Sequence, residues 1–308
     1  MSKSTISLIT LFEMFPDAES ARLYLETRLW ENGVICPQCK ATERVGKQPK
    51  VGFYRCNACT LDFTIRTGTI FERSHIPLHK WLYAMYMLVT ARKGISSLQL
   101  GKEIGVTQKS AWFMLQRLRE ACSAPDSIDK LRGIVELDEC FIGGKEANKH
   151  ESKKLKAGRG SVGKTAVLGM RERGGRTKAM PIKSTSIEDI QTAIHANIEV
   201  GSTLFSDEAT GYIGLNGLFF RHESVNHSAK EYVNGMASTN GIESVWAVLK
   251  RGVNGVYHQI SAKHLARYVD EFTFRLNEGD VKRHTLDRLD SFVVASVGKH
   301  ITYKELTA

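Results

Sequence analysis

The sequence predicts a mixed α/β protein in which two small N-terminal modules precede a mixed β-sheet with flanking helices. Three observations predict this class: two CxxC pairs near the N-terminus, a helical segment broken by a glycine turn, and a later series of strands and helices that fits one sheet. The chain has 308 residues, enough for about two to three domains. Its composition, 42% hydrophobic and 25% charged, is typical of a globular protein and excludes a disordered one.

The two CxxC pairs predict a small zinc ribbon. Cys36 and Cys39 form the first pair, Cys56 and Cys59 form the second, and sixteen residues separate them. Two residues between thiolates let one tight turn present both sulfurs to one ion, and two such turns complete a tetrahedron. A thioredoxin-like redox motif is disfavoured because no βαβ pattern surrounds either pair, and disulfides are disfavoured because no export signal is seen. We therefore expect a structural zinc ion with no open position for catalysis.

A glycine turn between helical patterns predicts a helix-turn-helix. Apolar residues recur with helical spacing from Leu78 to Arg92, and a short helix over 96–104 follows. The next three residues form a tight turn, with Thr107 as the N-cap of the following helix. An ordinary pair of packed helices would give the same pattern. Beside a zinc ribbon in a basic chain we favour the DNA-binding alternative, with Lys109 and Arg117 as DNA contacts.

The remaining elements predict one mixed sheet. We expect strands over 133–144, 165–171 and 176–183, a helix that begins at the N-cap Ser186, strands over 202–207 and 219–225, and helices over 239–251 and 262–276. Three hairpin-connected strands, a crossover helix and a returning strand make a ribonuclease H-like sheet. In that topology the first and fourth strands lie side by side.

Three acidic residues on these elements are candidates for a metal site. Asp138 lies in the first strand, Asp207 ends the fourth strand, and Glu243 lies in the helix over 239–251. Converging carboxylates suit two Mg²⁺ ions, which accept hard oxygen ligands and leave room for phosphate and water. Each acid also has a purely structural alternative: Asp207 could simply end a strand, and Glu243 could interact with the helix dipole.

The first strand carries two further acids, Glu136 and Glu139. Burying a carboxylate costs several kcal/mol unless it is paired or binds a metal. In a strand, Glu136 shares a face with Asp138, and Glu139 lies on the other face. Both could contact the metal shell, and neither is assigned to the triad.

The charge distribution indicates a polyanionic partner. Lys and Arg number 43 against 33 Asp and Glu, a net charge of +10. Nearly all of the surplus lies in 141–183, where twelve basic residues outnumber three acidic ones. A solvated, mobile loop is one explanation, and a phosphate-contacting surface is the other. The candidates for such a surface include Lys153, Lys154, Lys156 and Arg159.

Membrane-spanning and export segments are not expected. The longest apolar run, Trp81 to Ala91, is too short to cross a bilayer. The first twenty residues carry acids soon after a short apolar stretch and have no small-residue cleavage site, unlike a signal peptide. We therefore expect a cytoplasmic protein with no membrane partner.

With these motifs in place, the chain resembles bacterial insertion-sequence transposases of the DDE class that carry an N-terminal zinc ribbon. The resemblance covers about residues 15 to 300 and includes CPQC…CNAC, VELDECFIGG, LFSDEATGY, VNHS and STNGIESVWAVLKRG. The last motif is the most specific, because Asn240, Glu243, Trp246 and Lys250 match a family helix. Lys250 follows Glu243 by two helical turns, so both would face the same DNA.

The resemblance implies a DNA transposase of an insertion sequence. Asp138 would bridge two Mg²⁺ ions (or Mn²⁺), and Asp207 and Glu243 would each hold one. Water would cleave a strand at the element's end, and the freed 3′-hydroxyl would attack target DNA. Double-stranded DNA is the implied partner, bound by a homodimer or larger assembly at the nucleoid. Asn240 and His227 are accessory candidates, and for His227 we favour a surface histidine over a role in the pocket.

Two other functions stay open from the sequence. One is a non-enzymatic DNA-binding regulator built from the ribbon and the helix-turn-helix. The other is a ribonuclease H-like nuclease that cuts without joining. For every alternative we expect a helical segment over 1–29, a zinc ribbon over 30–74, a helix-turn-helix over 75–124 and a ribonuclease H-like domain over 130–300.

Overall fold

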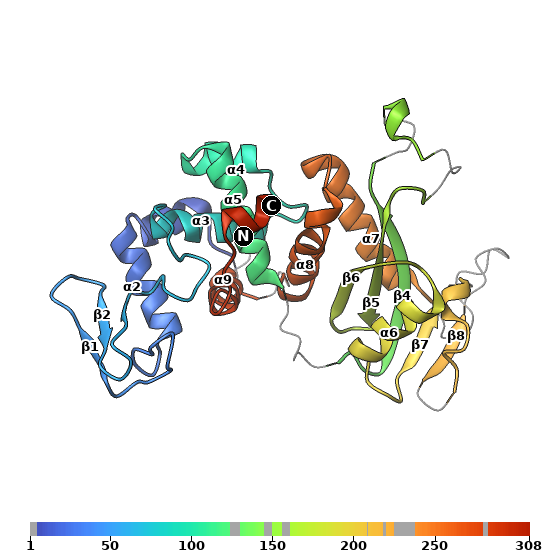
Figure 1. The fold of residues 1–308 in the computed structure, drawn as a ribbon, viewed down its shortest axis with the longest axis horizontal. Helices are drawn as coiled ribbons and strands as arrows, with labels where there is room; N and C mark the ends of the chain where they lie inside the picture. Colours follow the sequence, from blue (N-terminus) through green and yellow to red (C-terminus); the bar gives the residue numbers. More distant parts are fainter. Residues whose placement is uncertain are drawn as a thin grey trace. The chain divides into compact units, whose positions relative to one another are not determined.

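The computed structural model describes residues 5–123, 130–144, 150–155, 161–207, 209–217, 220–224, 238–279 and 283–308 (Figure 1). The chain divides into two compact units, one of residues 1–123 with 278–308 and the other of residues 124–277. No helix in the described ranges is long and apolar enough to cross a membrane.

The first unit begins with two helices and a small ribbon. Its first elements are α1 (Leu8–Met14), α2 (Ala18–Leu29), β1 (Val45–Lys47), β2 (Tyr54–Cys56) and β3 (Asp62–Phe63). Strand β2 lies between β1 and β3 and is antiparallel to both. The ribbon core is aromatic: Tyr54 stacks on Phe63 with ring centroids 5.8 Å apart, and Trp30 meets Tyr54 edge-on at 5.0 Å.

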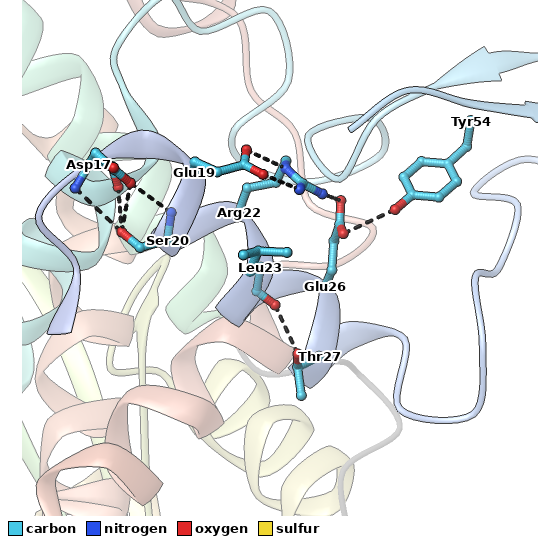
Figure 2. Close-up of polar contacts among 8 residues, drawn as sticks. All are labelled: Asp17, Glu19, Ser20, Arg22, Leu23, Glu26, Thr27 and Tyr54. Atoms are coloured by element: carbon cyan, nitrogen blue, oxygen red, sulfur yellow. Dashed lines mark hydrogen bonds and ion pairs between the residues drawn. The ribbon is translucent and has the colours of Figure 1, made fainter. Parts of the chain in front are cut away.

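Helix α2 is tied to the ribbon by the ion-pair network that Figure 2 shows. Arg22 pairs with Glu19 and Glu26 along α2, and the Tyr54 hydroxyl donates to Oε2 of Glu26 at 3.0 Å. Asp17 begins the helix by accepting the Ser20 N–H at 2.8 Å. Helix α2, which precedes the predicted start of the ribbon module at residue 30, is therefore bonded to the ribbon.

The predicted helix, glycine turn and capped helix are all present. They are α3 (Leu78–Thr90), α4 (Ser97–Ile104) and α5 (Gln108–Cys122). Gly105 ends α4 in the left-handed region with φ +64°, a conformation that favours glycine. The Thr107 hydroxyl caps α5 by accepting the Ser110 N–H at 3.2 Å.

Helices α9 (Thr285–Ala295) and α10 (Tyr303–Thr307) pack within the first unit. Helix α9 contacts α2, α3 and α5. The Ile70 N–H donates to the Ser296 carbonyl at 3.2 Å, and the Gly298 N–H donates to the Gly68 carbonyl at 2.8 Å. The predicted ribonuclease H-like domain, which ran to residue 300, therefore extends too far: these contacts assign residues 278–300 to the first unit.

The second unit is built on a mixed five-stranded sheet. Its strands are β4 (Ile134–Ile142), β5 (Thr165–Glu172), β6 (Thr177–Ile182), β7 (Thr203–Ser206) and β8 (Arg221–Ser224), in the order β6-β5-β4-β7-β8. Strand β4 is antiparallel to β5 and parallel to β7. The order confirms the predicted mixed α/β class and ribonuclease H-like topology, with the first and fourth strands adjacent.

Helices cover both faces of this sheet (Figure 1). Helix α6 (Ile187–Asn197) packs on one face, and α7 (Asn240–Gly252) and α8 (Ala262–Glu278) pack on the other. Side chains alternate along β4, so Val135 and Leu137 enter the α6 core while Cys140 and Ile142 enter the α7–α8 core. The even-numbered positions of β4, Asp138 among them, therefore face α7.

Candidate active site

The four ribbon cysteines converge on one point. Their Sγ atoms all lie within 4.8 Å of one another. The Sγ atoms of Cys36 and Cys59 are 3.6 Å apart, and those of Cys39 and Cys56 are 3.5 Å apart. A tetrahedron with Zn–S bonds of about 2.3 Å has edges of about 3.8 Å. The spacing therefore fits a structural zinc ion with four sulfur ligands.

In the second unit, Asp138 and Asp207 lie at the same level of adjacent strands. Glu136 of β4 pairs with Phe205 of β7 in the parallel register, and each aspartate lies two positions further along the chain. Neighbouring strands are about 4.8 Å apart, so the two aspartates are neighbours. Each carboxylate also accepts a backbone N–H, at 2.8 Å for Asp138 and 3.0 Å for Asp207.

Negative charge from three carboxylates is concentrated around Asp138. The pKa of Asp138 is raised to about 6, first by burial, then by the charge of Asp207, with a smaller contribution from Glu243. In the described part of the chain, the carboxylate oxygens of these three residues do not all lie within 4.8 Å of one another. Like charges separate unless a cation neutralises them. The cluster of hard oxygen donors fits divalent cations such as Mg²⁺.

Trp246 fixes α7 beside Asp138. Asp138 pairs with Gly169 of β5, and a Cβ atom at Gly169 would lie 2.4 Å from Cζ2 of Trp246. The indole ring therefore occupies the space that any larger residue at 169 would fill. Because Glu243 is on the same helix, this packing sets how close Glu243 comes to the sheet.

Glu243 lies in the first turn of α7. Its backbone N–H donates to the Thr239 carbonyl at 3.0 Å, and its Oε1 accepts from the Thr239 hydroxyl at 3.2 Å. The side chain is exposed, and so is that of Lys250 two turns later. Burial raises the pKa of the Cys140 thiol, and the charge of Lys250 lowers it. The charge of Lys250 therefore reaches β4 at Cys140, the second residue after Asp138.

Glu139 faces the opposite side of β4, toward Tyr212. Burial raises the pKa of Glu139 to about 7, an interaction with Tyr212 lowers it, and the charges of Asp207 and Asp138 raise it. Tyr212 is 1% exposed, and burial together with Glu139 raises the pKa of its hydroxyl. Glu139 therefore lies on the face of β4 opposite to Asp138, as the alternation along a strand predicts, and still experiences the charges of both aspartates.

Comparison with known proteins shows the family of the chain. Residues 130–277 match the model of the ISXO2-like transposase domain, and residues 16–61 match the transposase zinc-ribbon domain. The "Uncharacterized protein in transposable element ISH50" of Halobacterium salinarum is 31% identical over 271 residues, covering 84% of this chain and 90% of that protein. The chain belongs to the IS1595 (ISXO2-like) family of DDE transposases with an N-terminal zinc ribbon. The relative is archaeal, so a bacterial source stays a prediction.

A solved structure, "Mos1 transposase paired-end complex with left transposon end", is also similar to this transposase. It covers 72% of this chain and 80% of its own, with 13% identity and a TM-score of 0.28. The family itself implies that this DDE transposase is a phosphoryl-transfer enzyme that binds DNA.

Some of the predicted DNA-binding and accessory residues of the transposase domain lie in the described structure. Lys154 pairs with Glu151 at 2.7 Å, and Asn240 begins α7 with an exposed side chain. Lys153 ends the short 3-10 helix η2 (Glu151–Lys153). The side chain of Lys153 and all of Lys156, Arg159 and His227 lie outside the described residues.

The two candidates on α5 have different environments. Lys109 is exposed in the first turn, with Nζ 4.9 Å from the centroid of the Tyr303 ring. Arg117 is only 4% exposed and donates to the carbonyls of Ile70, Glu72 and Ile301. The prediction that Arg117 contacts DNA is therefore wrong for this structure, since its donors hold the first unit together.

Sequence reasoning missed how the start of α7 is held. Glu136, Arg171 and Arg173 all hydrogen-bond to residues 238–244. The sequence does indicate that Glu136 has a partner, because an acid in a buried strand requires one. The identity of that partner is not indicated, because it lies 106 positions later.

Proposed function

We propose that this transposase cleaves DNA at the ends of its element and joins the freed 3′-hydroxyl to target DNA with two Mg²⁺ ions. Asp138 would bridge both ions, and Asp207 and Glu243 would each hold one. When bound, the ions would activate the attacking oxygen and stabilise the leaving oxygen of an in-line displacement at phosphorus. Mn²⁺ accepts similar oxygen ligands and is expected to substitute.

One observation supports the triad above all: the charges of Asp207 and Glu243 both act on the half-buried Asp138. Asp138 lies in the middle of β4, Asp207 directly follows β7, and Glu243 lies in the first turn of α7. An arrangement that gathers like charges in a partly buried place costs free energy unless a cation offsets it. A purely structural role for each acid separately does not explain why they are gathered.

The chemistry balances without a covalent enzyme intermediate. In the first step a water oxygen bonds to phosphorus and the 3′-oxygen of the cleaved strand leaves, taking up a proton. In the second step that 3′-hydroxyl bonds to a target phosphate, and the target's own 3′-oxygen leaves. Each step forms one P–O bond and breaks one, so no side chain of the transposase has to become a nucleophile.

DNA would be held mainly through its phosphates. Lys250 is well placed, because it follows Glu243 by two turns on the exposed side of α7. Lys109 would contact DNA from the first turn of α5, the part of such a helix that meets the major groove. The basic residues Lys153, Lys154, Lys156 and Arg159 would contact flanking or target DNA. Asn240 and His227 are proposed accessories, and joining two ends requires at least two copies.

A strand-transfer assay tests the proposal. Duplexes carrying the terminal sequences that flank the gene are mixed with plasmid target, Mg²⁺ and the transposase. We expect cleaved ends and joined products longer than the input, both abolished in Asp138→Ala while DNA binding is retained. Glu188→Ala, an exposed acid in the first turn of α6, is the matched control.

Two results would contradict the proposal. Cleavage without joined products would indicate a nuclease, and binding without cleavage in Mg²⁺ or Mn²⁺ would indicate a DNA-binding regulator.

A further inference from the structure

A buried acid caps the helix that carries Glu243. Glu136 is 4% exposed, and its Oε2 accepts the backbone N–H of Ile242 at 3.0 Å. Ile242 is the third residue of α7, where a helix leaves its N–H groups without intrahelical partners. A carboxylate at this position satisfies the donor and interacts favourably with the helix dipole. Glu243 is the next residue along the chain.

The other oxygen of Glu136 is held by an arginine. Its Oε1 accepts from Nε and Nη2 of Arg173, both at 3.3 Å. Nη2 of Arg173 also donates to the Ser238 carbonyl at 3.2 Å, and the guanidinium lies 5.0 Å from the centroid of the Phe205 ring. One oxygen of the carboxylate is therefore held by Arg173, the residue that follows β5, and the other is held by α7.

A second arginine, which lies within β5, holds the same turn. Nη1 of Arg171 donates to the Gly241 carbonyl at 2.7 Å and to the Ser244 hydroxyl at 3.0 Å. These two contacts lie on either side of Glu243 in the sequence. Together with Glu136, they leave the backbone of Glu243 little freedom to move relative to Asp138.

The fit around the carboxylate is tight enough to require a glycine. A Cβ atom at Gly241 would lie 2.4 Å from Oε2 and 3.0 Å from Cδ of Glu136. The φ angle of Gly241 is not in the left-handed region, so the backbone conformation alone would accept alanine. The carboxylate of Glu136 is what excludes a side chain there.

We propose that Glu136 is a positioning residue for the metal site: by binding the Ile242 N–H it sets where Glu243 lies relative to Asp138. The inference rests on the proposed role of Glu243 as a metal ligand. Groups that orient metal ligands typically change metal affinity or activity by about 10- to 100-fold when removed. We therefore expect Glu136 to act on metal affinity without touching the metal.

Mn²⁺ binding to the full-length chain, with its ribbon zinc retained, tests this directly. Electron paramagnetic resonance measures the free Mn²⁺ that remains at each concentration. We expect Glu136→Ala and Gly241→Ala each to weaken Mn²⁺ binding by about 10-fold or more. Glu136→Gln should lose less, because its amide oxygen can still accept the Ile242 N–H. Gly255→Ala is the control, since a Cβ there meets no atom within 4 Å in the part of the chain that the structure describes.

Hydrogen exchange gives a second measurement that does not depend on metal or activity. The peptide covering 238–246 should exchange faster in Glu136→Ala and Gly241→Ala than in the wild type or Gly255→Ala. Affinity for DNA should be unchanged, because Glu136 is buried. If Glu136→Ala fails to fold, Gly241→Ala carries the test with the carboxylate intact.

The outcomes separate the two claims. If the wild type and Asp138→Ala bind Mn²⁺ with equal affinity, the proposed metal site is overturned, and this inference with it. The positioning role alone would be overturned by a different result. In that case the wild type binds Mn²⁺ more tightly than Asp138→Ala does, but Glu136→Ala and Gly241→Ala bind it as tightly as the wild type.

Discussion

The indole ring of Trp246 fills the space above Gly169, the residue that pairs with Asp138 across the sheet. A Cβ atom at Gly169 would lie 2.4 Å from Cζ2 and 2.7 Å from Cη2 of the ring. The contact joins α7 to the centre of the sheet at the level of Asp138. A small residue at 169 is thus required for α7 to deliver Glu243 to its place.

Gly169→Ala should therefore destabilise the second unit and reduce DNA cleavage. The added methyl group collides with a buried ring, and such overpacking costs about 1–3 kcal/mol. Urea unfolding followed by tryptophan fluorescence measures the loss of unfolding free energy. Gly144→Ala is the control, because a Cβ there has no atom of the described residues within 4 Å. Equal stability of the two variants would show that the ring moves aside freely.

Removal of zinc should unfold the ribbon. The ribbon core is small, so its four sulfur–metal bonds supply much of its stability. We expect one zinc per wild-type chain by elemental analysis, lost in Cys39→Ser, together with faster hydrogen exchange over 45–63. Cys122→Ala, at a buried cysteine of α5, should keep the zinc. Retention of zinc by Cys39→Ser would contradict the four-sulfur site.

The two α5 residues should respond in opposite ways to substitution. Arg117→Ala leaves three backbone carbonyls without their donor and should cost at least about 2 kcal/mol of unfolding free energy. Lys109→Ala should leave stability within about 0.5 kcal/mol and weaken DNA binding. If Lys109 contacts a phosphate, the slope of log affinity against log salt falls by about one. An unchanged slope would exclude that contact.

The raised pKa of Asp138 predicts a pH-dependent stability when Mg²⁺ and Mn²⁺ are absent. Its folded value, about 6, exceeds the ordinary 3.8, so the folded state binds the proton more tightly. The resulting stabilisation is fully present below about pH 4 and is lost as the pH rises through 6. Asp138→Asn, neutral at every pH, should gain relative stability between pH 5 and 7.

The whole shift corresponds to about 3 kcal/mol, of which roughly 1–1.5 kcal/mol falls between pH 5 and 7 and is the gain expected there. Chemical denaturation of both proteins across pH 5 to 8, with zinc present, measures it. Added Mg²⁺ should stabilise the wild type and not the variant at pH 8. Parallel pH profiles for the two proteins would show that no charge accumulates at Asp138.

Features with local signals could be predicted from the sequence. Gly105 and Thr107 mark the turn between α4 and α5 by their own conformational preferences, and Ser186 caps α6 for the same reason. The adjacency of Asp138 and Asp207 followed from strand order, because few topologies connect three hairpin strands, a helix and a returning strand.

Features that depend on distant partners could not be predicted. Arg117 is a basic residue on a helix, as a DNA contact would be, but its partners Ile70 and Ile301 lie far away in the sequence. The chain after residue 278 gives no local sign that it packs against residues 68–70. Glu136 likewise shows only that some partner must exist, because a helix start 106 positions later supplies it.

The central claim is that Asp138, Asp207 and Glu243 bind divalent cations together. The most direct measurement is anomalous diffraction from crystals of the chain grown with Mn²⁺ and a DNA end. We expect anomalous peaks coordinated by carboxylate oxygens of all three residues, with Asp138 shared between two ions. Peaks at other residues alone, or a peak that contacts fewer than two of the three acids, would contradict the account.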